Sequence, residues 1–584
     1  MLVSISIVVV FLHYGLDLTD ESYYLINIAN PGNYSETVGA LSHFGFVYAP
    51  IFDLFAENVA ALRMFSIVVT LLLGTTLAWL ILTRFREWKF SVQTRLTISL
   101  LTAAPITLIA VFNGQWLPTP SYNSLNLVGL LLFFNGIFGY TTTNSSVKSK
   151  ILWMLVISLG LSLEVMAKPS TAALSFFVCI SCLILLPNKR LLVLLYELLG
   201  VTLCTAVISL IAVVAIYGNV EAAGNSFLLG AKSAWLLQGT QLVSKQTELE
   251  KISLFEEAVI SLAAGAILLS VILHILRRIL SKERNAFVYL AQLAIMFAGC
   301  VIAAWNQLNF ALAINGAAIW LAFSTLAKVK QPKDWREYLL GLSLMSGPML
   351  YAAGSNNNYW VSSQSAVVLS VLGTVFLFLK VSGVGIYTFT KLASFLFLVQ
   401  VFTLLQLLQA TENPYRQDKL DLKGTVKLAV PNDGQVLWVS KQLGQEIDKL
   451  RIDLMKQDFV KGSPMLDLTG RSPGLIFAVE GASLGAAWHL GGYPGSENYF
   501  IHTIEEIDCS ILASAWIIAE SESSLAISPR VLSKFGAQFP TDYEEVSRFS
   551  YSPGESEPSV SGYRSIYKPS RQNIVANKCK ELQQ

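Results

Sequence analysis

The first 409 residues alternate between long apolar runs and short polar connections. A membrane-spanning helix needs about 20 mostly apolar residues, so the runs are read as spans. The thirteen runs cover roughly residues 1–15, 62–83, 96–112, 125–141, 151–167, 171–187, 191–216, 257–276, 286–304, 308–327, 338–353, 362–379 and 389–409. The first is short for a span, so either the true start lies upstream or the first helix is tilted. The pattern predicts an all-α polytopic membrane domain over residues 1–409.

The pattern changes after Glu412, where mixed polar sequence replaces the apolar runs. Short strand-like runs and one helical stretch near 442–455 are separated by turns that contain Gly and Pro. The strand-like runs are 426–430, 435–439, 474–479 and 511–518. We predict a small α/β or α+β domain over residues 410–545. A Ser/Pro-rich tail over 546–584 is expected to be poorly ordered.

Composition agrees with a chain that lies mostly in lipid. Hydrophobic residues make up 53% and charged residues 14% of the chain, and the mean hydropathy is +0.55, whereas soluble domains carry about 25% charge. Lys and Arg collect in alternate connections, which marks those connections as cytoplasmic. The N-terminus is then inside and the C-terminal domain outside. The net charge of +2 argues neither for nor against nucleic acid, because the basic residues are not pooled on one segment. With so much of the chain in lipid, we expect the lipid bilayer, and no nucleic acid, as a partner.

The first outer segment, residues 16–61, is long and acidic, and its pieces 20–30 and 47–57 are expected to be short interfacial helices. Asp20 and Glu21 follow the first apolar run directly and are themselves followed by Tyr23 and Tyr24. A general base acting on a lipid-borne substrate must lie at this depth. Asp20 is the candidate base, and Glu21 would orient it, bind the acceptor or share the proton. The alternative is a helix N-terminus, capped at residue 19 or 20, with Glu21 favourable to the helix dipole.

Two basic residues break the expected charge pattern at the outer side. Lys168 ends the fifth run next to Pro169 and is a candidate for binding a donor phosphate. Its alternative is an ion pair with Glu164, one turn earlier. Arg63, at the outer mouth of the second run, is a second phosphate candidate, against simple snorkelling to the interface.

Tyr23, Tyr24 and five further residues are candidate substrate contacts. His43 could assist proton transfer or bind a metal, although a single His beside scattered acids is more often structural. Tyr122 and Asn123 follow two prolines in the second outer loop, where ordinary turn chemistry is the alternative. Asn356 and Asn357 lie in an outer turn rich in amides and aromatics, which suits sugar hydroxyls and ring faces but equally a polar turn with interfacial anchors.

The cysteines give one weak structural signal. Cys509 and Cys579 fall in the polar C-terminal region and would form a disulfide if that region is extracytoplasmic. Cys179 and Cys182 lie within an apolar run without a nearby His, so they are interpreted as small hydrophobic residues.

Short motifs resemble the GT-C class of glycosyltransferases, and most closely the bacterial relatives of protein O-mannosyltransferases and of lipid A aminoarabinose transferases. The strings that carry the resemblance are Asp20-Glu21-Ser22-Tyr23-Tyr24, Pro120-Ser121-Tyr122-Asn123 and Ala167-Lys168-Pro169-Ser170. The span number, the long first outer loop and the outer C-terminal domain also suit that class. One departure is that the second outer loop, 113–124, holds no carboxylate where some relatives place a second functional acid. The resemblance therefore leaves a divalent metal ion open as a cofactor.

The resemblance implies an inverting glycosyltransferase at the outer face of a bacterial inner membrane. Its donor would be a polyprenyl-phosphate sugar, and its acceptor a lipid, glycan or protein hydroxyl. The main alternative is a transporter or flippase of lipid-linked glycans, which is expected to place ionisable residues near mid-membrane instead. A non-catalytic scaffold would not explain the length and acidity of segment 16–61.

Overall fold

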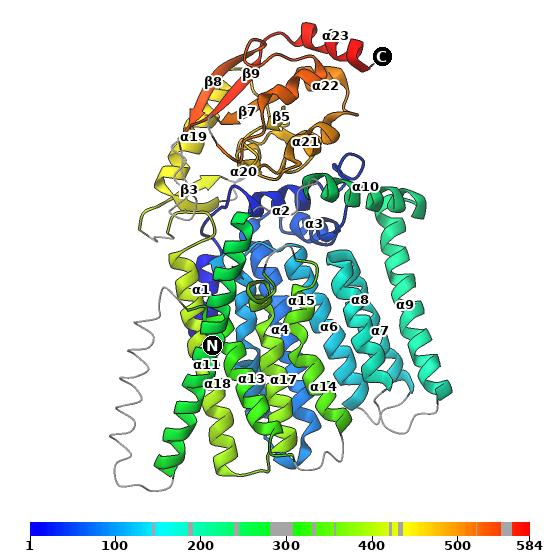
Figure 1. The fold of residues 1–584 in the computed structure, drawn as a ribbon, viewed down its shortest axis with the longest axis vertical. Coiled ribbons are helices and arrows are strands. Elements are labelled where there is room, and N and C mark those ends of the chain that lie inside the picture. Colours follow the sequence, from blue (N-terminus) through cyan, green and yellow to red (C-terminus); the bar gives the residue numbers. More distant parts are fainter. Residues whose placement is uncertain are drawn as a thin grey trace.

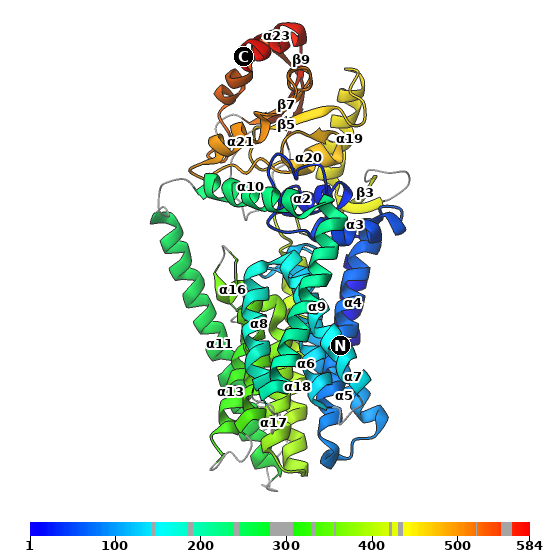
Figure 2. The ribbon, with the colours of Figure 1, turned by 90° about the vertical axis from the view of Figure 1, so that its right-hand side faces the viewer.

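The computed structural model describes residues 1–142, 147–184, 191–238, 245–280, 308–329, 335–355, 358–419, 423–429, 436–520, 523–550 and 563–583. A bundle of long helices forms one half of the molecule, and a domain of strands and short helices sits on one end of it (Figure 1). The view at right angles shows the same two-part division (Figure 2).

Eight of the described helical segments are long and apolar enough to cross a membrane. They are α4 (Val59–Arg84), α5 (Val92–Ala103) with η2 (Ala104–Ala110), α6 (Tyr122–Thr142), α7 (Val147–Ala167), α9 (Leu191–Tyr217), α11 (Lys245–Leu280), α16 (Tyr359–Ser363) continued through η3 (Gln364–Ala366) by α17 (Val367–Val381), and α18 (Ile386–Glu412). The protein is therefore a mostly helical, multi-span membrane protein.

Shorter helices occupy most of the remaining apolar runs. They are α1 (Leu2–Phe11), α8 (Pro169–Ile184), α13 (Phe310–Leu326), and the pair α14 (Trp335–Met345) and α15 (Gly347–Ala352). The pair falls on the predicted run 338–353, which is interrupted at Ser346. The predicted run 286–304 lies outside the described residues, so thirteen spans stay a prediction.

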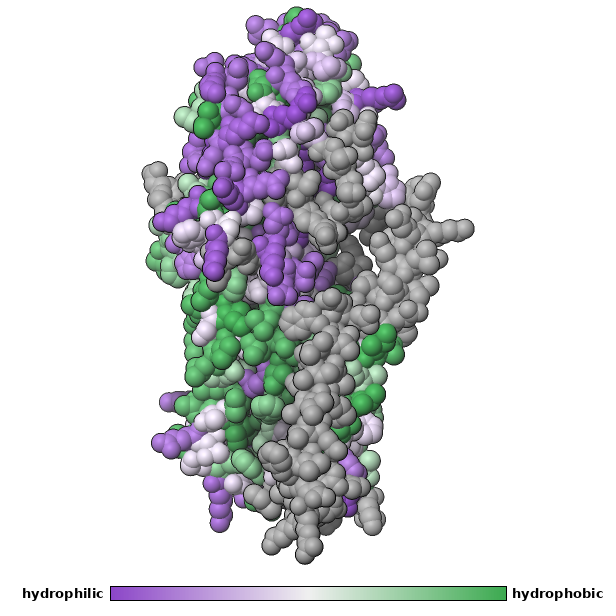
Figure 3. Space-filling view, turned by 90° about the vertical axis from the view of Figure 1, so that its left-hand side faces the viewer, coloured by the Kyte–Doolittle hydropathy of each residue, from purple (hydrophilic) through white to green (hydrophobic). Residues whose placement is uncertain are grey.

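Surface hydropathy follows the same division. On the face shown in Figure 3, hydrophilic side chains gather over the C-terminal domain, and a hydrophobic band covers the helices beneath it. Exposed apolar residues on the long helices as a whole include Leu72 on α4, Leu203 on α9 and Phe397 on α18. Such surfaces are stable in lipid rather than in water.

Three helices lie at the end of the bundle that carries the C-terminal domain (Figure 1). They are α2 (Asp20–Ala29), α3 (Phe44–Leu54) and α10 (Val220–Gln238). The first two confirm the helices expected over 20–30 and 47–57, whereas α10 was not anticipated from the sequence. Groups expected on the opposite, cytoplasmic side do meet one another, since Glu337 pairs with Arg84 and Lys380. Which end of the bundle faces the cytoplasm stays a prediction.

The C-terminal domain contains a hairpin and a mixed five-stranded sheet. The hairpin joins β3 (Thr425–Ala429) to β4 (Val436–Ser440) and is followed by α19 (Lys441–Met455). The sheet order is β6-β5-β7-β9-β8, with β5 parallel to both neighbours and β9 antiparallel to both of its own. Its strands are β5 (Pro464–Asp467), β6 (Ala482–Ser483), β7 (Trp516–Glu520), β8 (Tyr543–Phe549) and β9 (Arg564–Pro569), and its further helices are α20 (Pro473–Ala478), α21 (Ser496–Ile504), α22 (Cys509–Ala513) and α23 (Gln572–Gln583).

Three sequence predictions for this domain are wrong, one of them in part. Of the predicted strand 511–518, residues 511–513 belong to α22 and only 516–518 belong to β7. Residues 474–478 of the predicted strand 474–479 belong to α20 instead, because Pro473 starts a short helix at its first position. Residues 564–583 form β9 and α23 instead of a poorly ordered tail, because β9 pairs with both β7 and β8. The structure also joins Cys509 to Cys579 by a disulfide, with Cα atoms 5.7 Å apart, which ties α23 to α22.

Candidate active site

The connection between α1 and α2 is built around a buried carboxylate. Asp17 is fully buried, and its side chain accepts hydrogen bonds from the Thr19 hydroxyl at 2.8 Å and from the Glu21 amide at 3.0 Å. In return, the Glu21 carboxylate accepts a hydrogen bond from the Asp17 amide at 2.9 Å. Reciprocal bonds of this kind satisfy the free amides at a helix start. Burial, followed by the nearby charge of Asp20, raises the pKa of Asp17 to about 8.

Glu21 is held in a buried ion pair rather than facing a substrate. Its side chain is 1% exposed, and one oxygen lies 2.6 Å from a guanidinium nitrogen of Arg63, which is itself fully buried. The Thr119 hydroxyl donates to the same oxygen. Arg63 also donates to the carbonyls of Leu12, Tyr14 and Gly15 at 2.6–3.3 Å, all in the α1–α2 connection. The pair thus fixes the backbone that leads to Asp20.

Asp20 differs from its neighbours because it keeps partial access to solvent. Its side chain is 21% exposed. One oxygen accepts from the Tyr415 hydroxyl at 2.9 Å, and a nitrogen of Arg416 lies 3.4 Å away. Burial raises the pKa of Asp20 above its ordinary value, while Arg416 and the Tyr415 hydrogen bond act in the opposite direction. An accessible carboxyl with a raised pKa is suited to accept a proton near neutral pH.

A row of aromatic side chains leads from the acidic segment to Lys168. Tyr23 and Tyr24 lie edge to face with centroids 5.7 Å apart, and Tyr24 lies 6.1 Å from Tyr122. The Lys168 ammonium sits 5.4 Å from the Tyr122 ring centre and 5.1 Å from that of Tyr351. The predicted residues on α2, α6 and the α7–α8 corner are therefore linked through direct contacts.

Lys168 does not form the expected alternative ion pair. Its ammonium donates to the Ser355 hydroxyl at 3.0 Å and to the Tyr351 carbonyl at 3.4 Å, and the structure records no ion pair with Glu164. Burial lowers the pKa of Lys168 to about 8. A desolvated ammonium over two ring faces keeps an attraction for an incoming anion, because water screens it little.

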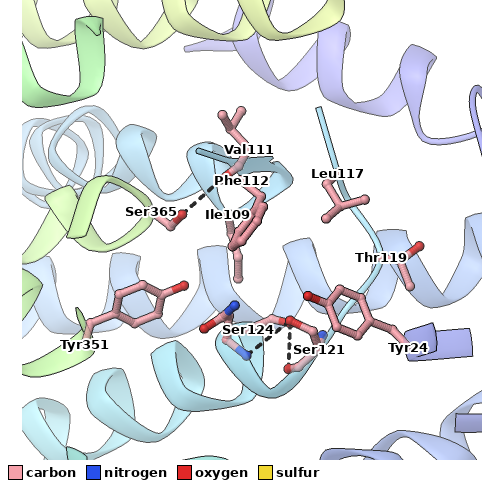
Figure 4. A pocket seen from close by; sticks show the side chains of 11 residues that line it. Tyr24, Ile109, Val111, Phe112, Leu117, Thr119, Ser121, Ser124, Tyr351 and Ser365 are labelled. Atoms are coloured by element: carbon pink, nitrogen blue, oxygen red, sulfur yellow. Dashed lines mark hydrogen bonds between the residues drawn. The ribbon is translucent and has the colours of Figure 1, made fainter. Parts of the chain in front are cut away.

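A small polar cavity lies beside these residues (Figure 4). Its volume is about 20 Å³, enough for about one water molecule. Tyr24 and Tyr351 stand on opposite sides of it. Hydroxyl and amide groups supply most of the remaining polar lining, from Thr119, Ser121, Asn123, Ser124 and Ser365. The cavity holds no charged side chain and is too small for a sugar ring.

Other predicted residues are placed elsewhere or lie outside the described residues. The ring of His43 hydrogen-bonds the Tyr217 hydroxyl at 2.9 Å at the end of α9, and burial lowers its pKa. His43 thus contacts the α9–α10 corner, while its neighbour Phe44 contacts Tyr24. Asn356 and Asn357 lie outside the described residues.

The structure offers no clustered metal ligands in the part that it describes. Within that part, no three side chains of His, Cys, Asp or Glu come close enough to hold an ion together. Asp17 and Glu21 use their oxygens for backbone and Arg63 contacts instead.

Sequence reasoning missed four residues of this site. Tyr415 and Arg416 follow Pro414 after the end of α18, on the side predicted to be outside, where a basic residue again breaks the expected charge pattern. The signal that identified Lys168 applies equally to Arg416. Asp17 and Thr119 carry no comparable signal, because their roles depend on long-range partners.

Comparisons with known proteins give only distant likenesses. No family model and no curated protein matches the chain. Two crystal structures of ArnT from Cupriavidus metallidurans each match 98% of this chain and 97% of their own chain. The sequence identity is 13% and the TM-score 0.41 for the apo structure. The identity is 12% and the TM-score 0.41 for the structure bound to undecaprenyl phosphate. The structure of the Archaeoglobus fulgidus oligosaccharyltransferase in complex with Zn and sulfate matches 99% of this chain and 76% of its own chain, at 11% sequence identity and a TM-score of 0.42. Likeness at this level assigns no activity, ligand or metal to this chain.

Proposed function

We propose that this protein is an inverting glycosyltransferase that moves a sugar from a polyprenyl phosphate to an acceptor hydroxyl. The observation that carries the proposal is that the adjacent acids Asp20 and Glu21 differ in their contacts and in their exposure to solvent. Glu21 is committed to Arg63, whereas Asp20 stays partly exposed beside Tyr415 and Arg416. The helix-terminus alternative explains an acid at this position, but it does not explain the contacts of Asp20 with Tyr415 and Arg416, which are 395 and 396 residues away.

The proposed reaction is a single displacement at the anomeric carbon. Asp20 takes the proton of the acceptor hydroxyl. At the same time the oxygen of that acceptor hydroxyl forms the new glycosidic bond to the anomeric carbon. The bond from the anomeric carbon to the phosphate oxygen breaks, and the phosphate leaves with the electron pair. Arg416 and Lys168 are the cations proposed to stabilise the growing charge on the phosphate. Because Arg63 is enclosed by protein partners, it supports the loop in this scheme rather than the phosphate.

The proposed setting is the outer face of a bacterial inner membrane. The acidic segment and the C-terminal domain share one end of the bundle, opposite the Arg84, Glu337 and Lys380 group. The Cys509–Cys579 disulfide supports an oxidising compartment for that end. The bilayer would retain the lipid tail of the donor while its phosphate reaches the surface.

A lipid-linked sugar donor, labelled on the sugar, tests the proposal with purified protein in nanodiscs. Asp20→Asn should lower turnover by about 10²–10⁴-fold. Asp53→Asn is the matched control, because Asp53 is an exposed acid of the same outer segment. Equal turnover in the Asp20→Asn protein and the control would reject the base assignment.

The transporter alternative draws on Glu164, which is fully buried within α7. Buried acids in a span are frequent in proton and ion pathways. A dithionite-type scrambling assay with a labelled donor lipid would separate the two functions. Transbilayer movement without sugar transfer would favour the transporter.

A further inference from the structure

We infer that the C-terminal domain positions the catalytic loop, so that the outer domain is a working part of the active site. The loop in question is residues 12–19, between α1 and α2. The domain contacts this loop near both of its ends, through β4 and through the start of α20. The catalytic consequence rests on the proposed function, whereas the contacts themselves do not.

The first contact is a backbone pairing between the start of the loop and β4. The amide of Trp438 donates to the His13 carbonyl, and the Gly15 amide donates to the Trp438 carbonyl, both at 2.8 Å. Tyr14 and Trp438 form a parallel bridge, and their rings stack with centroids 6.2 Å apart. The loop therefore pairs with β4 through a single β-bridge at Tyr14.

The second contact is at the other end of the loop, beside Asp20. The Gly474 amide, near the start of α20, donates to the Leu18 carbonyl at 2.8 Å. The approach is so close that a Cβ on Gly474 would lie 2.4 Å from the Leu18 Cα and 2.6 Å from the Ser22 hydroxyl oxygen. Real Cβ atoms are not found at such distances, so only glycine permits this approach.

The part of the domain that carries Gly474 is itself rigidly held. Asp467 accepts from the amides of Thr469 and Ser472 at 2.9 and 2.8 Å. Arg471 forms a two-point ion pair with buried Glu520 on β7, at 3.1 and 2.6 Å. Loop 467–474 thus fastens α20 to the sheet.

Loop carbonyls have almost no freedom once these contacts are counted. The Arg63 guanidinium donates to the carbonyls of residues 12, 14 and 15, and the Trp438 amide donates to that of residue 13. The Ser22 hydroxyl takes the carbonyl of residue 17, and Gly474 takes that of residue 18. Because a buried carbonyl without a donor costs free energy, each partner restrains the loop. Two of these donors belong to the C-terminal domain, which makes Gly474 and Trp438 positioning residues for Asp20.

The variant Gly474→Ala tests the inference in the full-length protein. Gly536→Ala is the matched control, because its Cβ would meet the Lys578 Cβ at 2.5 Å, within the same domain but against α23 and not against the β3–β4 hairpin or α20. We expect amide hydrogen exchange in residues 15–23 to rise at least about tenfold in Gly474→Ala and to stay at the wild-type rate in the control. We also expect a lower kcat with an unchanged donor KM, since only the base is displaced.

The readouts separate this inference from the proposed function. If exchange in residues 15–23 is unchanged in Gly474→Ala, the positioning role is overturned, whatever the activity. If the wild-type protein transfers no sugar, the proposed function fails while the exchange result still decides the contact. Trp438→Ala serves as a second variant should Gly474→Ala not fold, and it should raise exchange at residues 13–16 through the lost stacking on Tyr14.

Discussion

Replacing Arg63 with leucine should expose how much of the acidic pair is structural. Arg63 makes five hydrogen bonds, one of them to Glu21, and both side chains are almost fully buried. Breaking a buried ion pair by removing one partner costs about 3–5 kcal/mol. Each backbone carbonyl left without a donor adds about 1–3 kcal/mol unless water replaces it. Arg63→Leu should therefore remove a large part of the stability of the fold.

The matched control is Arg84→Leu, on the same helix. Arg84 pairs with Glu337 at 3.1 Å, but this pair is partly exposed and Glu337 keeps Lys380 as a partner. Its loss should cost about 1 kcal/mol or less. Adding Glu21→Gln to Arg63→Leu should restore part of the loss, because the uncompensated buried charge is then removed.

Denaturant titration of the four proteins in one detergent measures these differences. The expected order of stability is wild type, then Arg84→Leu, then the double variant, then Arg63→Leu. The reasoning would be refuted if Arg63→Leu were no less stable than Arg84→Leu, or if Glu21→Gln lowered its stability further.

Three other outcomes follow from the site. Turnover should fall as the pH drops through the pKa of Asp20, because the base must be deprotonated. Arg416→Gln should move this acid limb of the pH profile to higher pH, because it removes a positive charge that lowers the pKa of Asp20. An acid limb at the same pH in Arg416→Gln and wild type would show that Arg416 does not act on the base. Donor affinity should weaken as the pH rises through about 8, because Lys168, with a pKa of about 8, loses its proton there. Lys168→Arg should retain donor affinity at pH 9. A donor KM that does not change with pH in the wild type would contradict the phosphate contact. On non-reducing gels after mild proteolysis, Cys509→Ser should release the C-terminal peptide that Cys579 holds in the wild type, whereas equal release from both proteins would exclude the disulfide.

Much of the membrane domain could be predicted from hydropathy alone, because a helix in lipid must be apolar along its whole length. The acidic segment and its tyrosines were also visible, as was Lys168, which breaks the charge pattern. The division of labour between Asp20 and Glu21 was not visible. It depends on Arg63 and Thr119, which are 42 and 98 residues away from Glu21.

The errors have physical causes of the same kind. For Arg63, a basic position near the membrane surface predicts phosphate binding, and nothing in the sequence indicates the protein carbonyls to which it donates. The run 474–479 is apolar and short, and periodicity alone does not separate a buried strand from one helical turn. β9 was hidden in a polar tail, because its stability comes from pairing with β7 and β8 rather than from its own composition.

Turnover of Asp20→Asn and Glu21→Gln, measured side by side per folded molecule with a labelled lipid-phosphate sugar, tests the central claim most directly. The account predicts near-complete loss of transfer in Asp20→Asn and, within about tenfold, wild-type transfer in Glu21→Gln, whose main effect falls on stability. Loss of transfer in Glu21→Gln together with wild-type transfer in Asp20→Asn would contradict it.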